Sequence, residues 1–196
     1  NVSWTCNGRL NYAKPDVLRI MKESGCVFIN YGIESMDDEV LRNMNKALTT
    51  KQIIDGVENT LAAGISPGLN IIFGNIGDNK KVLNKSVEFL LKYDDGAQLR
   101  TIKPVTPYPG SPLYDRAIEK GLIVDCEDFY ENKHVNSDLP TVNFTELDDD
   151  EFLRCLYEAN SSILRNYFNK QFHSYDEQAK KLYFEKDTGF RGFRQR

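Results

Sequence analysis

The sequence predicts an α/β protein: a partial TIM-like parallel (β/α) barrel of about four β/α units with an α-helical C-terminal extension. Three observations lead to this prediction. Segments typical of strands and helices alternate four times in the first 120 or so residues, as expected of parallel β/α units with right-handed crossovers. A complete eight-unit barrel takes about 200 to 250 residues, so four units make about half a barrel. The residues that follow have mainly helical periodicity.

Composition is that of a soluble globular protein, with 40% hydrophobic and 28% charged residues among 196. The net charge of −4 gives no support to nucleic-acid binding. No apolar run approaches the roughly 18 to 20 residues of a membrane helix, and we expect no membrane association and a cytoplasmic protein. The four cysteines lack the short spacing of a metal loop and are too sparse for a disulfide framework, so we predict no metal ligands in this chain.

The first β/α units are marked by alternation, proline and glycine. Residues 2–6 alternate as a short strand, and Pro15 opens a helix that Gly25 ends. Residues 26–33 form a nearly unbroken apolar run, which predicts a strand covered on both faces. A helix through Val40, Leu41 and Met44 follows.

The next units follow the same pattern. Residues 49–52 offer a capping box for a helix that ends at Gly64. Residues 65–73 are predicted to be a strand, and the apolar positions from 82 to 91 predict a helix that Gly96 ends. A fourth strand is expected over residues 99–105.

The remaining chain contains less regular patterns. Ser111 and Pro112 predict the start of a short helix that Gly121 ends, and residues 124–144 are interpreted as a long surface excursion with one short strand. A long helix is expected through residues 152–167 and a last helix over 175–184. We therefore divide the chain into a partial barrel, residues 1–123, and a mostly helical extension, residues 124–196.

Ligand sites of parallel β/α proteins form at the carboxyl ends of the strands. Four candidate segments lie at such ends: Cys6 to Arg9, Gly32 to Ser35, Gly74 to Asp78, and Thr106 to Gly110. Each taken singly also fits an ordinary loop, but four at corresponding strand ends favour a shared pocket. The segment from Gly74 lacks the spacing of a dinucleotide fingerprint, and His134 and His173 have no nucleophile at motif spacing, so no catalytic residue is assigned.

At these residues the sequence resembles the second half of the core barrel of the radical S-adenosylmethionine (radical SAM) superfamily, most of all its cobalamin-binding-domain class. The resemblance covers residues 1 to about 123. The motifs that carry it are Trp4-Thr5-Cys6-Asn7-Gly8-Arg9, Tyr31-Gly32-Ile33-Glu34-Ser35, Val40 to Lys46, Ile72-Phe73-Gly74, and Thr106-Pro107-Tyr108-Pro109-Gly110.

The resemblance implies binding of S-adenosylmethionine and gives roles to seven residues. Glu34 and Ser35 would contact the ribose and methionine part, and Lys46 would reach the carboxylate of the cofactor. Arg9 would do similar work or bind substrate. Ile72 and Gly74 would form the adenine-binding strand end, and Tyr108 would overhang the pocket. The residues Asn75 to Asp78 depart from the family pattern, so the role of Asp78 is open.

In such enzymes a [4Fe–4S] cluster on a cysteine loop cleaves the cofactor to a 5′-deoxyadenosyl radical. This chain lacks that loop, so we expect the cluster only in a full-length protein, together with the missing N-terminal half of the barrel; the class also admits cobalamin there. The chain alone is expected to be inactive, with an unknown small-molecule substrate. The alternative is a cluster-free half-barrel that binds a nucleotide-like or anionic ligand. Open sheet edges predict either self-association or cover by the C-terminal helices.

Overall fold

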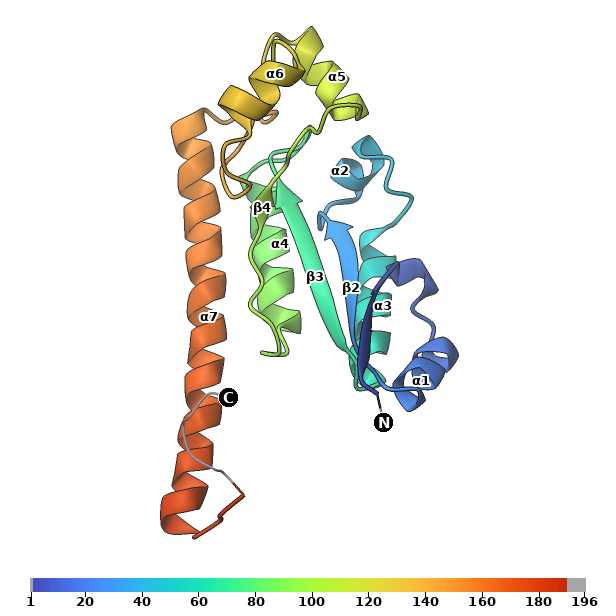
Figure 1. Ribbon diagram of the computed structural model, residues 1–196, viewed down its shortest axis with the longest axis vertical. Coiled ribbons are helices and arrows are strands. Elements are labelled where there is room, and N and C mark those ends of the chain that lie inside the picture. Colours follow the sequence, from blue (N-terminus) through green and yellow to red (C-terminus); the bar gives the residue numbers. More distant parts are fainter. Residues whose placement is uncertain (1, 190–196) are drawn as a thin grey trace.

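A computed structural model describes residues 2–189. Its centre is a four-stranded parallel sheet with the strand order β1-β2-β3-β4, accompanied by helices (Figure 1). This confirms the predicted partial α/β barrel. The strands are β1 (Trp4–Gly8), β2 (Cys26–Glu34), β3 (Ser66–Phe73) and β4 (Lys103–Pro104). Strand order equals chain order, as expected when each right-handed crossover places the next strand beside the last.

Helices connect the strands. They are η1 (Leu10–Tyr12), α1 (Pro15–Glu23), α2 (Asp38–Asn43), α3 (Thr50–Ala62), α4 (Lys80–Tyr93), α5 (Pro112–Glu119), α6 (Cys126–Asp128), η2 (Phe129–Lys133) and α7 (Asp149–Phe184). Those that the sequence predicts begin close to the expected residues, whereas η1, α6 and η2 were not predicted. The capping box is present, because Thr49 accepts from the backbone of Gln52 while the Gln52 side chain accepts from the backbone of Thr49. Pro15 and Pro112 lie in the first turns of α1 and α5.

The sheet is covered on one face only. On β2, Ile29, Tyr31 and Ile33 are buried, whereas the residues between them are partly exposed. Contacts with α1, α3 and α4 cover the buried face. The prediction that this strand is covered on both faces was therefore wrong. We call the other side of the sheet the open face.

The fourth strand is much shorter than the predicted residues 99–105. Only Lys103 and Pro104 pair with β3, and the Val105 amide donates to the Phe73 carbonyl at 2.8 Å. Pro104 has no N–H for a ladder. The backbone of Ile102 bonds to the Asn160 side chain on α7 and not to a neighbouring strand. Asn160 accepts from the Ile102 amide at 2.8 Å and donates to the Ile102 carbonyl at 2.9 Å.

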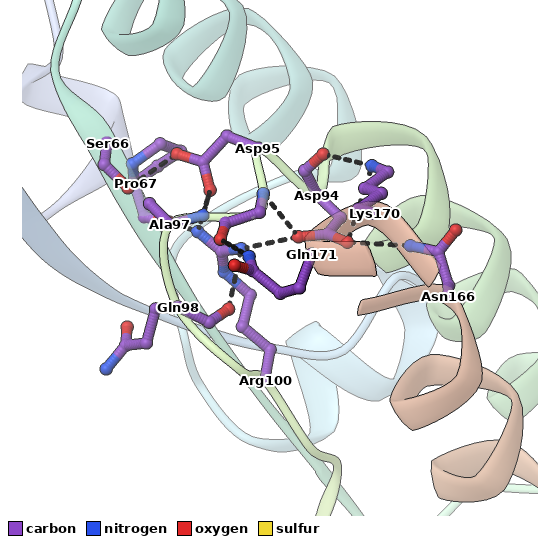
Figure 2. A network of polar contacts seen from close by, with 11 residues as sticks. Ser66, Pro67, Asp94, Asp95, Ala97, Gln98, Arg100, Asn166, Lys170 and Gln171 are labelled. Atoms are coloured by element: carbon purple, nitrogen blue, oxygen red, sulfur yellow. Dashed lines mark hydrogen bonds and ion pairs between the residues drawn. The ribbon is translucent and has the colours of Figure 1, made fainter. Parts of the chain in front are cut away.

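A buried polar network holds the chain between α4 and β4 against α7 (Figure 2). The Arg100 guanidinium contacts Asp94 at 3.2 Å and Asp95 at 2.9 Å. On α7, Asn166 donates to the Asp94 carboxylate at 2.7 Å, and Lys170 donates to the Asp94 carbonyl at 2.5 Å. These side chains explain why α4 ends at Tyr93 rather than at Gly96, and why the chain up to residue 102 is not a strand.

The two C-terminal helices that we predicted are one helix. α7 runs unbroken through 36 residues and contains neither glycine nor proline, so nothing in its sequence interrupts it. Phe152, Leu156, Ala159 and Ile163 are buried in the same hydrophobic core as the sheet. Large apolar side chains also lie exposed along α7, namely Leu153, Tyr157, Phe168, Phe172, Tyr183 and Phe184. No helix within residues 2–189 is long and apolar enough to cross a membrane.

The segment 124–144 contains α6 and the π-helix η2 but, within the described residues, no strand; the expected short strand there was wrong. Its apolar residues are used in a second small core beyond the carboxyl ends of the strands. The buried members are Val105, Ala117, Ile123, Phe129, Val142 and Phe144. Close aromatic and aliphatic packing explains why this region is ordered despite its weak periodicity. The division at residue 123 stays a prediction.

The two outer strands of the described sheet are β1 and β4. α7 lies on the β4 side, next to α4, and not along β1 (Figure 1). The helical cover that we considered for β1 is therefore absent from the described structure. Self-association through this edge stays a prediction.

Candidate functional site

Three of the predicted site residues meet where β1 and β2 end. Lys46 Nζ lies 2.6 Å from Glu34 Oε1, and Arg9 donates to the Lys46 carbonyl at 3.2 Å. Gly32 leaves room for this ion pair, since a Cβ there would lie 2.5 Å from Glu34 Oε1 and 3.1 Å from Lys46 Nζ. The two side chains keep 21% and 27% of their surface exposed. The pair is thus accessible to a ligand.

Unusual backbone geometry surrounds this ion pair. Glu34 has φ of 70°, and Asn45 and Ala47, which flank Lys46, have φ of 52° and 50°. The pairing of β2 with β3 is also irregular between Gly32 and Glu34. Left-handed conformations of residues other than glycine cost free energy and concentrate at functional sites. The backbone is therefore strained at Glu34 and on both sides of Lys46, where the two side chains form their ion pair.

Ser35 supplies a buried hydroxyl next to Glu34. Its exposed fraction is 1%, and among the described residues its Oγ has no hydrogen-bond partner. A buried polar atom without a partner costs about 1 to 3 kcal/mol. The Ser35 hydroxyl is therefore a buried group that destabilises the described structure.

The carboxyl end of β3 differs, because its polar groups are already paired. The backbone amides of Gly74 and Asn75 both donate to Asp78 Oδ2, at 3.0 and 2.9 Å. The Gly74 carbonyl accepts from Phe144 at 3.3 Å. Gly74 has φ of 107°, and a Cβ there would lie 3.0 Å from the Phe152 ring. The glycine is required by the packing of α7, which is a different reason from the cofactor approach that we predicted.

Asp78, whose role the sequence left open, anchors this loop. It is only 4% exposed. Burial raises its pKa to about 6, against the opposing effect of the amides of Asn75 and Gly74, which lower it. The nearby Asp37 carboxylate adds to the increase.

The last two predicted residues pack toward the second core. Ile72 is partly buried against it. Tyr108 is half exposed, and its ring lies 5.8 Å from that of Phe129 and 5.3 Å from that of His134. Its hydroxyl is 3.4 Å from His134 Nε2. The structure thus groups Arg9, Glu34 and Lys46, with Ser35 beside them in sequence, and places Tyr108 against η2.

Sequence reasoning missed a row of asparagines on the open face. Asn70 donates to Asn30 at 2.7 Å, and Asn30 donates to Asn7 at 3.2 Å. The signal was present, because one asparagine interrupts the apolar pattern of each of three strands. We call Asn7, Asn30 and Asn70 the asparagine row.

The described residues do not fit an iron–sulfur cluster. The thiols are dispersed: Cys26 is buried, Cys126 is exposed, and Cys6 and Cys155 are intermediate. Within residues 2–189 no group of three or more His, Cys, Asp or Glu side chains could hold a metal ion. Burial raises the pKa of the Cys26 thiol, which disfavours the thiolate that a metal needs.

Comparison with known proteins agrees with the resemblance. Residues 1–90 match the description "Radical SAM superfamily". This part of the chain is thus similar to the radical SAM superfamily. An uncharacterized methyltransferase of Pyrococcus horikoshii is 34% identical over 125 residues, which cover 63% of this chain and 27% of that protein. The bacteriochlorophyllide d C-12(1)-methyltransferase of Chlorobaculum tepidum is 25% identical over 154 residues, covering 74% of this chain and 33% of that protein.

Solved radical SAM structures share the fold. Coproporphyrinogen III oxidase (HemN) of Escherichia coli superposes with a TM-score of 0.56 at 14% identity, covering 84% of this chain and 32% of that chain. The radical SAM methyltransferase TsrM of Kitasatospora setae, solved with cobalamin and a [4Fe–4S] cluster, superposes with a TM-score of 0.51 at 16% identity, covering 58% of this chain and 22% of that chain. The chain thus spans about a quarter to a third of the length of these relatives.

Proposed function

We propose that this chain supplies the S-adenosylmethionine-binding residues of a radical SAM methyltransferase. The accessible Glu34–Lys46 ion pair at the carboxyl end of β2 is the observation that carries the proposal. The radical SAM match of residues 1–90 supports the cofactor, and the similarity to two methyltransferases supports the reaction class. When bound, S-adenosylmethionine would supply the methyl or adenosyl group for that chemistry.

The ion pair offers opposite charges to opposite parts of the cofactor. Glu34 Oε1 accepts from Lys46, and among the described residues Glu34 Oε2 has no donor, so it is available to ribose hydroxyls. Lys46 Nζ has further donors for the carboxylate of the methionine part. Ser35 would complete this side with its unpaired hydroxyl. Arg9 keeps Lys46 in place through its carbonyl.

The proposal assigns no residue of this chain as a ligand of the iron–sulfur cluster or of cobalamin. The dispersed cysteines do not fit a cluster, so in this proposal the cluster is held by residues other than those described. The only support for cobalamin is the similarity of the sequence to the cobalamin-binding class. The substrate of the methyl transfer is not specified by the ion pair.

Calorimetric titration of the chain with S-adenosylmethionine tests the proposal. We expect Glu34→Gln and Lys46→Met each to weaken binding by about ten- to a hundredfold, because each removes a charge-assisted hydrogen bond of roughly 1.5 to 3 kcal/mol. Lys51→Met is the matched control: Lys51 also forms a 2.6 Å ion pair, with Asp55, but on the exposed surface of α3.

Two results would count against the proposal. Unchanged affinity in both site variants would reject the roles of Glu34 and Lys46. Equal affinity for adenosine and for S-adenosylmethionine would show that the methionine part is not recognised, and would favour the nucleotide-binding half-barrel instead.

A further inference from the structure

The asparagine row crosses the open face of the sheet from β1 to β3. Asn7 is in register with Asn30, and each amide is joined to the next by the hydrogen bonds given above. Asn7 and Asn70 are exposed, and Asn30 is partly exposed. Asparagine is unfavourable in strands, so three on one sheet face need a reason other than strand formation.

Glycines opposite the row make room for it. Gly68 on β3 is in register with Asn30, and Gly32 on β2 is in register with Asn70. A Cβ at Gly68 would lie 2.5 Å from Asn30 Oδ1 and 2.7 Å from the Phe28 ring. Glycine inside a strand weakens the strand and marks a close approach of other groups. The alternation of asparagine and glycine on β2 and β3 therefore forms a low, polar surface.

The row leaves hydrogen-bonding groups of both kinds unpaired at its ends. Among the described residues, the carbonyl oxygen of Asn70 and the amide nitrogen of Asn7 have no protein partner. Asn70 lies two strands away from Asn7 and two residues further along the sheet, so about 12 Å separates them. Three charged side chains lie near the carboxyl end of this face: Glu34 and Lys46 form an ion pair, and Arg9, two residues after Asn7, donates to the Lys46 carbonyl. The free donor and the free acceptor of the row match a ligand that both donates and accepts hydrogen bonds, as a carboxamide does and a carboxylate or an ammonium group does not.

We propose that the asparagine row binds an uncharged ligand with carboxamide or lactam groups. Identifying this ligand as the substrate of the methyl transfer rests on the proposed function; the binding itself does not. Asn70 is in register with Gly32, whose Cβ position lies 2.5 Å from Glu34 Oε1, so the ligand would lie next to the cofactor residues on the open face. Asn7, Asn30 and Asn70 are then specificity-determining residues.

Nuclear magnetic resonance on the ¹⁵N-labelled chain tests this inference with three matched probes: benzamide, benzoate and benzylammonium. We expect benzamide to shift the side-chain amide signals of the row, and the two charged probes to leave them unchanged. Asn70→Leu should weaken benzamide binding about tenfold, because one amide partner is lost. Asn70→Ser should give the same loss while keeping the position polar. Asn169→Leu, at an exposed asparagine of α7, is the control without effect.

S-adenosylmethionine, added in a separate titration, keeps the two proposals apart. Its effect is read at the backbone amides of Glu34 and Ser35. No response of the row to benzamide, or an equal response to benzoate, overturns the inference even if Glu34 and Ser35 respond to the cofactor. A response to benzamide without any response to S-adenosylmethionine upholds the polar ligand surface and counts against the proposed function.

Discussion

The ends of β2 and β3 lie next to each other, but they differ in whether their polar groups have hydrogen-bond partners. After β3, the amides of Gly74 and Asn75 are both paired with Asp78. After β2, the Ser35 hydroxyl is buried without a described partner, and Glu34 has an unusual backbone conformation. The loop after β3 pairs these amides internally, whereas the end of β2 has an unpaired hydroxyl and a strained backbone.

This difference indicates where a ligand would contribute most. A strand end whose hydrogen bonds are all made gains little from a ligand, because binding would have to replace existing bonds. The β2 end can add hydrogen bonds without replacing existing ones, because its ion pair is partly exposed and Glu34 Oε2 has no donor among the described residues. We therefore expect the β2 end to dominate ligand recognition, and the β3 end to set the shape of the site.

The largest expected effect is at Gly74. Gly74→Ala should lower the free energy of unfolding by about 4 kcal/mol, because φ of 107° is strained for alanine and the new Cβ would press on the Phe152 ring at 3.0 Å. Gly110→Ala separates the two causes: its φ is 88°, but nothing lies within 4 Å of the Cβ position. It should cost about 1 kcal/mol. Urea unfolding measures both, and equal losses would contradict the role of Phe152.

The next effect is the pH dependence of the β3 loop. Because the pKa of Asp78 is raised from 3.8 to about 6, the folded chain retains a proton that the unfolded chain has lost. The contribution of Asp78 to the free energy of unfolding should therefore fall by about 3 kcal/mol as pH rises from about 4 to about 6, and stay level above. Asp78→Asn keeps an acceptor for both amides and removes this fall.

Urea unfolding of both proteins between pH 4 and pH 7 checks this effect. The difference between them isolates Asp78, since Asp37 and Asp95, whose pKa values are lowered, are common to both. A difference that does not vary with pH would show that the carboxyl at Asp78 ionises normally.

Local patterns in the sequence predicted the β/α units well. Proline at helix starts, the capping box at Thr49 and the apolar runs of β2 and β3 depend on neighbours along the chain, and the structure confirms the elements they indicate. The failures involve distant partners. Asn160 pairs with Ile102, and Arg100 donates to the Pro67 carbonyl on β3, in addition to its contacts within its own loop. These partners lie far along the chain, so no local pattern marks residues 99–102 as irregular.

The same distinction applies to the candidate site. The family motifs led to Glu34 and Lys46, which lie twelve residues apart and meet in the structure. They did not indicate that Gly74 packs against α7, because Phe152 follows far along the chain. The asparagine row was missed since it depends on strand register, which only the folded sheet provides.

The smallest effect, and the one of opposite sign, is expected at Ser35. Ser35→Ala should raise the free energy of unfolding by about 1 kcal/mol, because it removes a hydroxyl that is buried without a partner. Thr60→Val is the contrasting variant: the Thr60 hydroxyl is also buried, but it donates to Gly56 at 2.7 Å and lies 3.0 Å from the Tyr31 hydroxyl. Its loss should lower the free energy of unfolding by about 1 kcal/mol.

If the Ser35 hydroxyl at the end of β2 is left unpaired for a ligand, Ser35→Ala gains stability and loses affinity for S-adenosylmethionine in the same protein. A variant that loses stability as Thr60→Val does would mean that the Ser35 hydroxyl is already satisfied, and the contrast between the two strand ends would disappear.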